Sequence, residues 1–300
     1  MMMICEVHDD LVPGVHEFLR ARREFSPRTH WDPLFSYPWK NPEFPYGYAL
    51  MDSRGQIQGF LGTIYTRRTI NGKFFLSCNL SCWIVDERYR ASLGKAGKGV
   101  GRRMLDPVLG QKDVIATALS ANVLSTKSFL SAGFKSLDSG QMIIPVIPGF
   151  RGFGTTRKVE ISFKTCEIGR RLSEYEREVW NNHRCLPCQH FLMHSPDTEE
   201  YCYGIGTTVP VRRVPIMGEK VFNLCYLSNA QFFARHFWSL ASALWRERRL
   251  ALVRYDKRLI PQTISAMARG VVSPRWFYAS GIEVPEVDLA YTELVLYNLY

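Results

Sequence analysis

The first half of the chain alternates apolar and polar residues in a pattern that predicts an antiparallel sheet. Residues 46–51, residues 57–70 and a run that ends at Val85 are rich in β-branched and aromatic side chains, which favour strands. The segments between them, Asp52-Ser53-Arg54-Gly55 and Asn71-Gly72, have the composition of tight turns. The sequence therefore predicts three consecutive strands joined by hairpins.

The same criteria predict strands and helices over the rest of the chain. Further strands are expected at residues 4–7, 114–119, 141–146, 158–164, 201–209, 220–227, 250–255 and 291–299. Helices are expected at residues 11–25, 123–132, 172–180 and 229–248, and after Gly101, where apolar residues recur at helical spacing. Prolines and aromatic residues make residues 26–45 a loop. The predicted fold class is therefore α/β, with a mixed sheet of the α+β kind.

A glycine-rich segment, Gly97-Lys98-Gly99-Val100-Gly101, lies between the strand ending at Val85 and the next helix. Glycines allow successive backbone N–H groups to converge, and a helix N-terminus adds partial positive charge, so the segment is suited to a phosphate. A Walker loop would continue with Lys-Ser/Thr, but Arg102 follows here. A dinucleotide fold would end its next strand with an acidic residue, but residues 114–119 are followed by Ser120.

Two motifs at the appropriate separation resemble the GNAT N-acyltransferase family over about the first half of the chain. Val85-Asp86-Glu87-Arg88-Tyr89-Arg90 and the glycine segment resemble the end of that family's fourth strand and its pyrophosphate loop. Asn122–Ser128, followed by Phe129 and Gly133-Phe134, resembles its next helix. Two positions depart from the pattern. Ala96 replaces the Arg or Gln that opens the loop, and Phe129 replaces the general-acid Tyr of many relatives.

The resemblance implies that acetyl-CoA, or another acyl-CoA, is bound as a substrate. The residues that it places around the cofactor are Trp83, Ile84, Val85, Arg90, Gly97, Lys98, Gly99, Val100, Gly101, Arg102, Asn122, Ser125 and Ser128. For proton transfer it offers Asp86, the nearest carboxylate, and Asn79, which occupies the position where some relatives have a Glu base. An asparagine cannot accept a full proton, although it can orient a water molecule.

Prolines and glycines at residues 145–156 indicate a junction between two lobes. The predicted division is a GNAT-like acyl-CoA-binding lobe at 1–148, a linker at 149–156 and a degenerate GNAT-like lobe at 157–300 that shapes the acceptor site. The second lobe is interpreted as a divergent copy for two reasons. The segments 129–134 and 277–282 share a pattern, and the helix at 229–248 lies between strands as the helix after Gly101 does. The copy lacks a glycine loop, so one cofactor site is expected.

Composition and charge restrict the expected location of the protein and the kind of partner that it binds. The chain of 300 residues is 46% hydrophobic and has no apolar run long enough to span a membrane, so packed domains without a membrane contact are expected. Eight scattered cysteines and no evident signal peptide favour a cytoplasmic location. The net charge of +10 suits an anionic cofactor or acceptor, and also leaves nucleic acid as a less favoured partner.

The histidines and cysteines at residues 183–194 are the other candidate constellation. Cys185 and Cys188 form one Cys-x-x-Cys, but no second pair completes a zinc site, so no metal is predicted. The predicted function is transfer of an acyl group, most simply acetyl, from acyl-CoA to a primary amine of a small, anionic acceptor. Two alternatives stay open: a transferase that uses aminoacyl-tRNA or acyl carrier protein as donor, and a non-catalytic acyl-CoA-binding protein.

Overall fold

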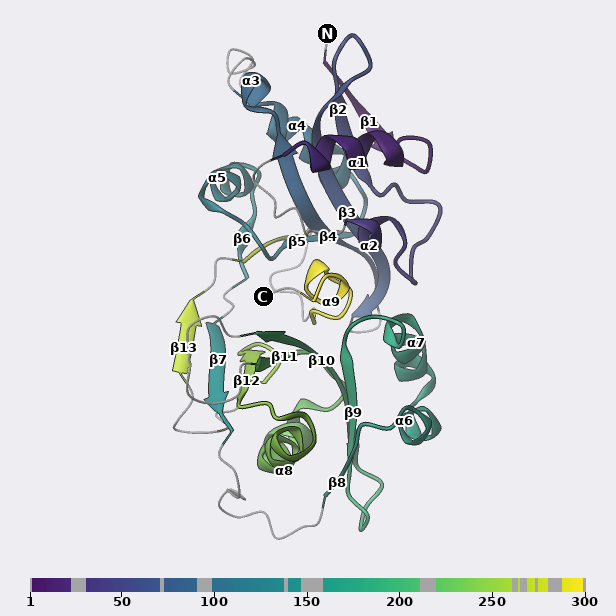
Figure 1. Cartoon of the computed structure of the whole chain (residues 1–300), viewed down its shortest axis with the longest axis vertical. Helices are drawn as coiled ribbons and strands as arrows, with labels where there is room; N and C mark the ends of the chain where they lie inside the picture. The colour runs from purple at the N-terminus through teal and green to yellow at the C-terminus, as the bar shows by residue number, and fades with distance from the viewer. Residues whose placement is uncertain are drawn as a thin grey trace. The chain divides into compact units, whose positions relative to one another are not determined.

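Two seven-stranded mixed sheets form the computed structural model (Figure 1). It describes residues 2–22, 31–70, 73–90, 99–137, 140–146, 159–210, 220–260, 264, 269–272, 275–279 and 288–298. The chain divides into two compact units. The first comprises Met1–Asp138, Pro274–Val287 and Tyr291–Glu293, and the second comprises Ser139–Ser273, Asp288–Ala290 and Leu294–Tyr300.

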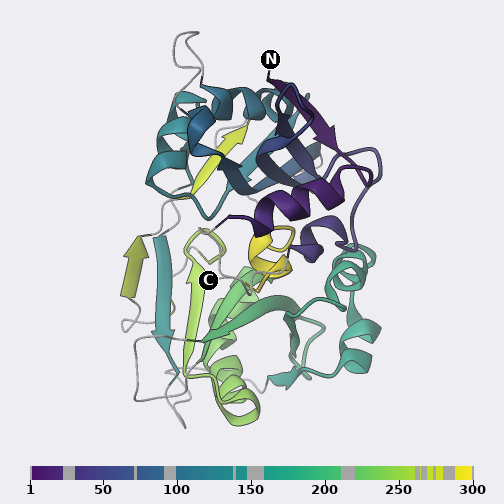
Figure 2. The ribbon, with the colours of Figure 1, turned by 45° about the horizontal axis from the view of Figure 1, so that its top comes forward.

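The sheet of the first unit has the strand order β1-β2-β3-β4-β5-β14-β6. Its strands are β1 (Met3–Val7), β2 (Gly47–Met51), β3 (Ile57–Ile70), β4 (Lys73–Val85), β5 (Val114–Ala118), β14 (Trp276–Ala279) and β6 (Lys135–Ser136). The four N-terminal strands form an antiparallel meander, whereas β4 and β5 are parallel. β14 comes from the C-terminal part of the chain and pairs antiparallel with β5 and β6, as the yellow strand in Figure 2 shows.

The sheet of the second unit repeats this order position by position as β8-β9-β10-β11-β12-β7-β13. Its strands are β8 (Glu160–Ser162), β9 (Gln189–His194), β10 (Tyr201–Pro210), β11 (Lys220–Leu227), β12 (Leu252–Asp256), β7 (Gly140–Pro145) and β13 (Arg269–Val272). β11 and β12 form its parallel pair, with one long helix between them in sequence. The two sheets differ in one respect, since each takes its sixth strand from the other half of the chain.

Helices cover the sheets with apolar faces. They are α1 (Val12–Arg20), α2 (Asp32–Phe35), α3 (Glu87–Arg90), α4 (Val100–Leu109), α5 (Val123–Ser131), α6 (Thr165–Arg171), α7 (Glu174–His183), α8 (Ala230–Arg248) and α9 (Glu293–Leu296). α4 buries Met104, Leu105 and Val108 in the core of the first unit, and Figure 1 shows α1 on the opposite face of that sheet. α8 buries Phe233 and Phe237 in the core of the second unit.

The predicted α/β class and most predicted elements are confirmed. The helix after Gly101 and the helix at 229–248 appear as α4 and α8, each between the parallel strands of its unit. This correspondence supports the interpretation of the second half as a divergent copy.

Two expectations about the C-terminal half are wrong. The strand predicted at residues 291–299 is replaced by α9 and buried turns, because an apolar run that is buried on all sides has no distinctive periodicity. The pattern shared by 129–134 and 277–282 is not a structural equivalence either, since Phe129 lies in α5 and Phe277 in β14.

The predicted linker at 149–156 lies outside the described residues. The predicted division into lobes at 1–148 and 157–300 stays a prediction, as does the cytoplasmic location. In the part of the chain that the structure describes, none of the helices combines the length and apolar character that crossing a membrane requires.

Candidate functional site

The parallel strands β4 and β5 part where β4 carries a bulge. Their pairing runs from Leu76 opposite Val114 to Leu80 opposite Ala118. On the other side of β4, the register with β3 shifts so that Leu61 faces both Cys82 and Trp83. Cys82 has a φ of 53°, a left-handed conformation that is uncommon for a residue other than glycine. The bulge bends β4 away from β5 and opens a gap at their ends.

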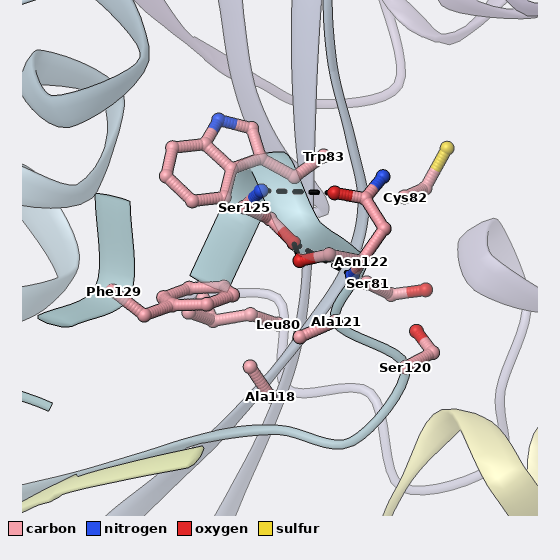
Figure 3. Close-up of a pocket in the computed structure, with 10 residues that line it drawn as sticks. All are labelled: Leu80, Ser81, Cys82, Trp83, Ala118, Ser120, Ala121, Asn122, Ser125 and Phe129. Carbon is pink, nitrogen blue, oxygen red and sulfur yellow. Dashed lines mark hydrogen bonds between the residues drawn. The ribbon is translucent and has the colours of Figure 1, made fainter. Parts of the chain in front are cut away.

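A pocket occupies this gap (Figure 3). One side is formed by the last part of β4, and the other by the residues that follow β5 and by α5. Its lining residues are Leu80, Ser81, Cys82, Trp83, Ala118, Ser120, Ala121, Asn122, Ser125 and Phe129. Three residues that the sequence predicted near a cofactor, Trp83, Asn122 and Ser125, therefore share one pocket.

Asn122 and Ser125 are held by the N-terminus of α5. The Asn122 side chain accepts a hydrogen bond from the Ser125 N–H at 2.9 Å, and the Ser125 Oγ accepts one from the Asn122 N–H at 2.9 Å. This reciprocal capping box satisfies two backbone donors of the first turn and fixes both side chains at the pocket wall. Ser128, which was predicted to join them, does not line the pocket.

The indole of Trp83 forms a second wall between α4 and α5. Its ring centroid lies 5.0 Å from that of Phe129. A Cβ atom at Gly101 would approach the Trp83 ring to 3.2 Å, so a glycine allows this close packing. The buried Trp83 Nε1–H makes no hydrogen bond in the structure as described. This nitrogen faces Gly101, since a Cβ atom there would lie 3.8 Å from it.

The other predicted cofactor residues surround the start of α4 and the end of β4. Ile84 and Val85 end the strand, and the Val85 carbonyl accepts a hydrogen bond from Arg90 Nε at 2.5 Å. Gly99 is the N-cap of α4, with Val100 buried next to it. The Arg102 guanidinium lies 3.3 Å from the Asp106 carboxylate, one helical turn on. The remaining two, Gly97 and Lys98, lie outside the described residues.

Asp86 is held in an ionic cluster and does not line the pocket. Its carboxylate accepts hydrogen bonds from Arg22 Nη1 at 2.8 Å and from Arg88 Nε at 3.0 Å. These bonds, led by those from Arg88, hold the pKa of Asp86 well below its usual value. A carboxylate stabilised as an anion is a weak proton acceptor, which argues against the predicted role as base.

Replacing Asp86 by asparagine is expected to lower the free energy of unfolding by about 2 kcal/mol, because the guanidinium of Arg22 loses its anionic partner. Urea titration at neutral pH would measure the difference. Glu87→Gln is a suitable control, because the Glu87 carboxylate is exposed and 3.8 Å from its partner, Arg90. Equal stability of Asp86→Asn and the wild type would show that the ionic cluster around Asp86 does not contribute to the free energy of unfolding.

Asn79 makes hydrogen bonds, one of them to a residue far away in the sequence, that the sequence did not predict. Its Nδ2 donates to Thr117 Oγ1 at 3.1 Å, and its Oδ1 accepts a hydrogen bond from the backbone N–H of Glu293 at 2.8 Å. Glu293 lies 214 residues further along the chain, yet it belongs to the same compact unit. Asn79 therefore anchors Glu293, a carboxylate residue, next to β4.

The carboxylate of Glu293 is buried beside the pocket. Its side chain accepts a hydrogen bond from Ser120 Oγ at 2.6 Å, and Ser81 adds another. Burial raises the pKa of Glu293 above its usual value, although the hydrogen bonds from Ser120 and Ser81 oppose this. Ser81 and Ser120 both line the pocket, and Figure 3 shows their hydroxyls on the same side of it.

The equivalent place in the second unit is arranged differently. Asn223 of β11 pairs with Arg254 of β12, whose Nε donates to the Asn223 Oδ1 at 2.5 Å. α8 follows directly after its N-cap, Asn229, without a glycine. That only the first unit carries a cofactor site stays a prediction.

The histidine–cysteine segment forms a hydrogen-bonded chain. Cys188 Sγ lies 3.5 Å from His190 Nε2, and His190 Nδ1 lies 2.8 Å from the Tyr203 hydroxyl. Among the described residues, no group of three or more His, Cys, Asp or Glu side chains is arranged to hold a metal ion.

Comparison with known proteins identifies the fold. No protein-family model matches the chain, and no curated protein sequence matches it. Several solved structures, in contrast, match the chain. A GCN5-related N-acetyltransferase from Anabaena variabilis has a TM-score of 0.60 at 12% identity, covering 92% of this chain and 72% of that chain. One from Kribbella flavida has a TM-score of 0.53 at 12% identity, covering 92% and 70%.

The likeness extends to an acyltransferase named for a longer acyl group. Saccharomyces cerevisiae N-myristoyltransferase with bound myristoyl-CoA and inhibitors has a TM-score of 0.50 at 10% identity, covering 92% of this chain and 79% of that chain. Because these matches cover nearly the whole chain, they confirm the GNAT-like fold that the resemblance of the first half predicted.

Proposed function

We propose that this chain, which has the fold of GNAT N-acyltransferases, transfers an acyl group from acyl-CoA to a primary amine. The observation that carries the proposal is the pocket between β4 and β5, opened by the bulge at Cys82. It exposes the end of one strand and the start of a capped helix to the same space. A linear thioester can enter such a gap and meet backbone donors there.

Several residues fit coenzyme A by their chemistry. The backbone of Trp83, Ile84 and Val85 would hold the thioester and pantetheine. The backbone at Gly99–Gly101 would meet the diphosphate at the start of α4, where the helix N-terminus favours an anion. A Cβ at Gly99 would meet no atom of the described residues within 4 Å, so these residues leave space for a side chain at this turn.

The bound acyl-CoA supplies an activated carbonyl, and the chain supplies positioning, charge stabilisation and proton removal. Backbone N–H groups at the end of β4 would stabilise the negative charge that develops on the thioester oxygen. We take acetyl as the simplest acyl group. A small anionic acceptor, such as an amino acid or an amino sugar nucleotide, suits the net charge of +10.

Calorimetric titration with acetyl-CoA tests the proposal. The wild type is expected to bind it, and Gly99→Glu is expected to weaken binding about 100-fold, because a carboxylate beside the diphosphate adds repulsion where space permits the side chain. Gly270→Glu is the matched control, since Gly270 also has an open environment and lies in the second unit.

This titration, together with assays of CoA release and of aminoacyl-tRNA binding, distinguishes the proposal from its two alternatives. A wild type that does not bind acetyl-CoA contradicts the proposal. Binding without release of CoA in the presence of any primary amine favours the non-catalytic alternative. Tight, steeply salt-dependent binding of aminoacyl-tRNA in place of acetyl-CoA would instead favour the alternative donor.

A further inference from the structure

We propose that Glu293 receives the proton of the attacking amine through the hydroxyl of Ser120. The inference rests on the proposed function and names its proton acceptor. The juxtaposition is specific, since Ser120 follows β5 and Glu293 belongs to the segment 291–293, yet Ser120 Oγ and Glu293 Oε1 are 2.6 Å apart.

Glu293 and Ser120 differ in their accessibility to a substrate, and this difference suggests different roles. Glu293 is 2% exposed, so a substrate does not reach its carboxylate directly. Ser120 is exposed and lines the pocket in which the thioester is proposed to lie. The Ser120 hydroxyl therefore connects the pocket to the buried carboxylate, and it is the group that would touch the amine.

The surroundings hold the carboxylate in place and favour proton uptake. The backbone N–H of Glu293 is fixed by Asn79, and Ser81 and Ser120 hydrogen-bond its side chain. Its titratable neighbour is Cys82, and burial raises the pKa of that thiol well above its usual value, so the thiol stays neutral. A buried carboxylate with a raised pKa takes up a proton more readily than the ion-paired Asp86.

Ser120 passes one proton in each direction during the proposed reaction. The amine nitrogen forms a bond to the thioester carbonyl carbon and passes a proton to Ser120 Oγ, while the Ser120 proton passes to Glu293 Oε1. The C–S bond then breaks, and the proton returns from Glu293 through Ser120 to the thiolate of CoA. The products are the amide and the free thiol, and both residues regain their starting protonation.

Glu293→Gln tests the assignment, because the amide keeps an acceptor for Ser120 but cannot take up the proton. CoA release from acetyl-CoA is measured with an amino sugar nucleotide or amino acids as acceptors, and separately with hydroxylamine. With the primary amine, kcat is expected to fall about 100-fold, and the increase of rate with pH through the pKa of Glu293 should disappear. Hydroxylamine is a much weaker base than an alkylamine, so the nitrogen of its adduct loses its proton to water more readily, and the variant should lose much less activity with it.

Two further variants complete the test. Ser120→Ala should also lose turnover with the primary amine while still binding acetyl-CoA. Glu176→Gln is a matched control in the second unit, since Glu176 is also buried, at 6% exposed, and accepts hydrogen bonds from Ser173 and Tyr201. It should keep full activity.

The outcomes separate this inference from the proposed function. A wild type that neither binds acetyl-CoA nor releases CoA with any acceptor overturns both. An active wild type with a Glu293→Gln variant that keeps its turnover overturns the inference alone. So does a variant that loses turnover equally with amines and hydroxylamine, because that pattern indicates a structural role.

Discussion

Replacing Gly206 by alanine is expected to lower the free energy of unfolding by about 3 kcal/mol, near the upper end of overpacking effects. Gly206 lies in β10 at the bulge with β11. An alanine Cβ would lie 2.2 Å from Phe222 Cζ and 2.8 Å from the backbone oxygen of Asn223. The Phe222 ring is fully buried in the core of the second unit, so it has no free space into which it can move.

The control is Gly270→Ala in the same sheet, where the added Cβ would meet no atom within 4 Å in the part of the chain that the structure describes. Its stability should stay within about 0.5 kcal/mol of the wild type. Urea unfolding followed by tryptophan fluorescence measures both variants. If Gly206→Ala is as stable as Gly270→Ala, the packing described for β10 and β11 is incorrect.

The second large effect is a loss of stability in weak acid that depends on His190. Burial lowers the pKa of His190 from its usual 6.5 to about 4. The folded state therefore holds this imidazole neutral, whereas the unfolded chain binds a proton below pH 6.5. Stability from this source is complete above that pH and is lost as the pH falls towards 4. The difference between the pKa values of the unfolded and folded states corresponds to about 3 kcal/mol of folding stability.

Thermal unfolding of the wild type and of His190→Gln between pH 7 and pH 4 measures this contribution. The glutamine variant should be less stable at pH 7, because the bond to Tyr203 is altered, but its stability should depend less on pH. The neighbouring Cys188 does not titrate in this range, since burial raises its pKa to about 12. Parallel pH curves for the two proteins would contradict the assignment.

Local patterns predicted the elements of this fold well. The run that ends at Val85 and the segment at 114–119 appear as β4 and β5, because β-branched residues and flanking turns are local signals. The family resemblance placed Asn122 next to a helix, and the structure makes it the N-cap of α5, which acts on backbone groups within its own turn. The order of these elements agrees with the GNAT resemblance, which came from the motifs at residues 85–101 and 122–134.

The chemistry beside the pocket could not be predicted in the same way. Asp86 was selected because it is near Val85 in sequence, but the structure places it with Arg22 and Arg88. Glu293 was missed because no local pattern indicates a contact with Ser120, which is 173 residues away. Its segment also has the apolar composition of an ordinary buried strand, so nothing distinguished the one carboxylate within it.

The exchange of the sixth strands has a consequence for biosynthesis. β5 can acquire its neighbour β14 only after the ribosome has made residues 276–279, and Glu293 emerges later still. The N-terminal sheet is therefore incomplete, with an unpaired edge, during most of translation. A nascent chain arrested near residue 150 should be protease-sensitive around β5 and should gain protection only when the C-terminal residues are released.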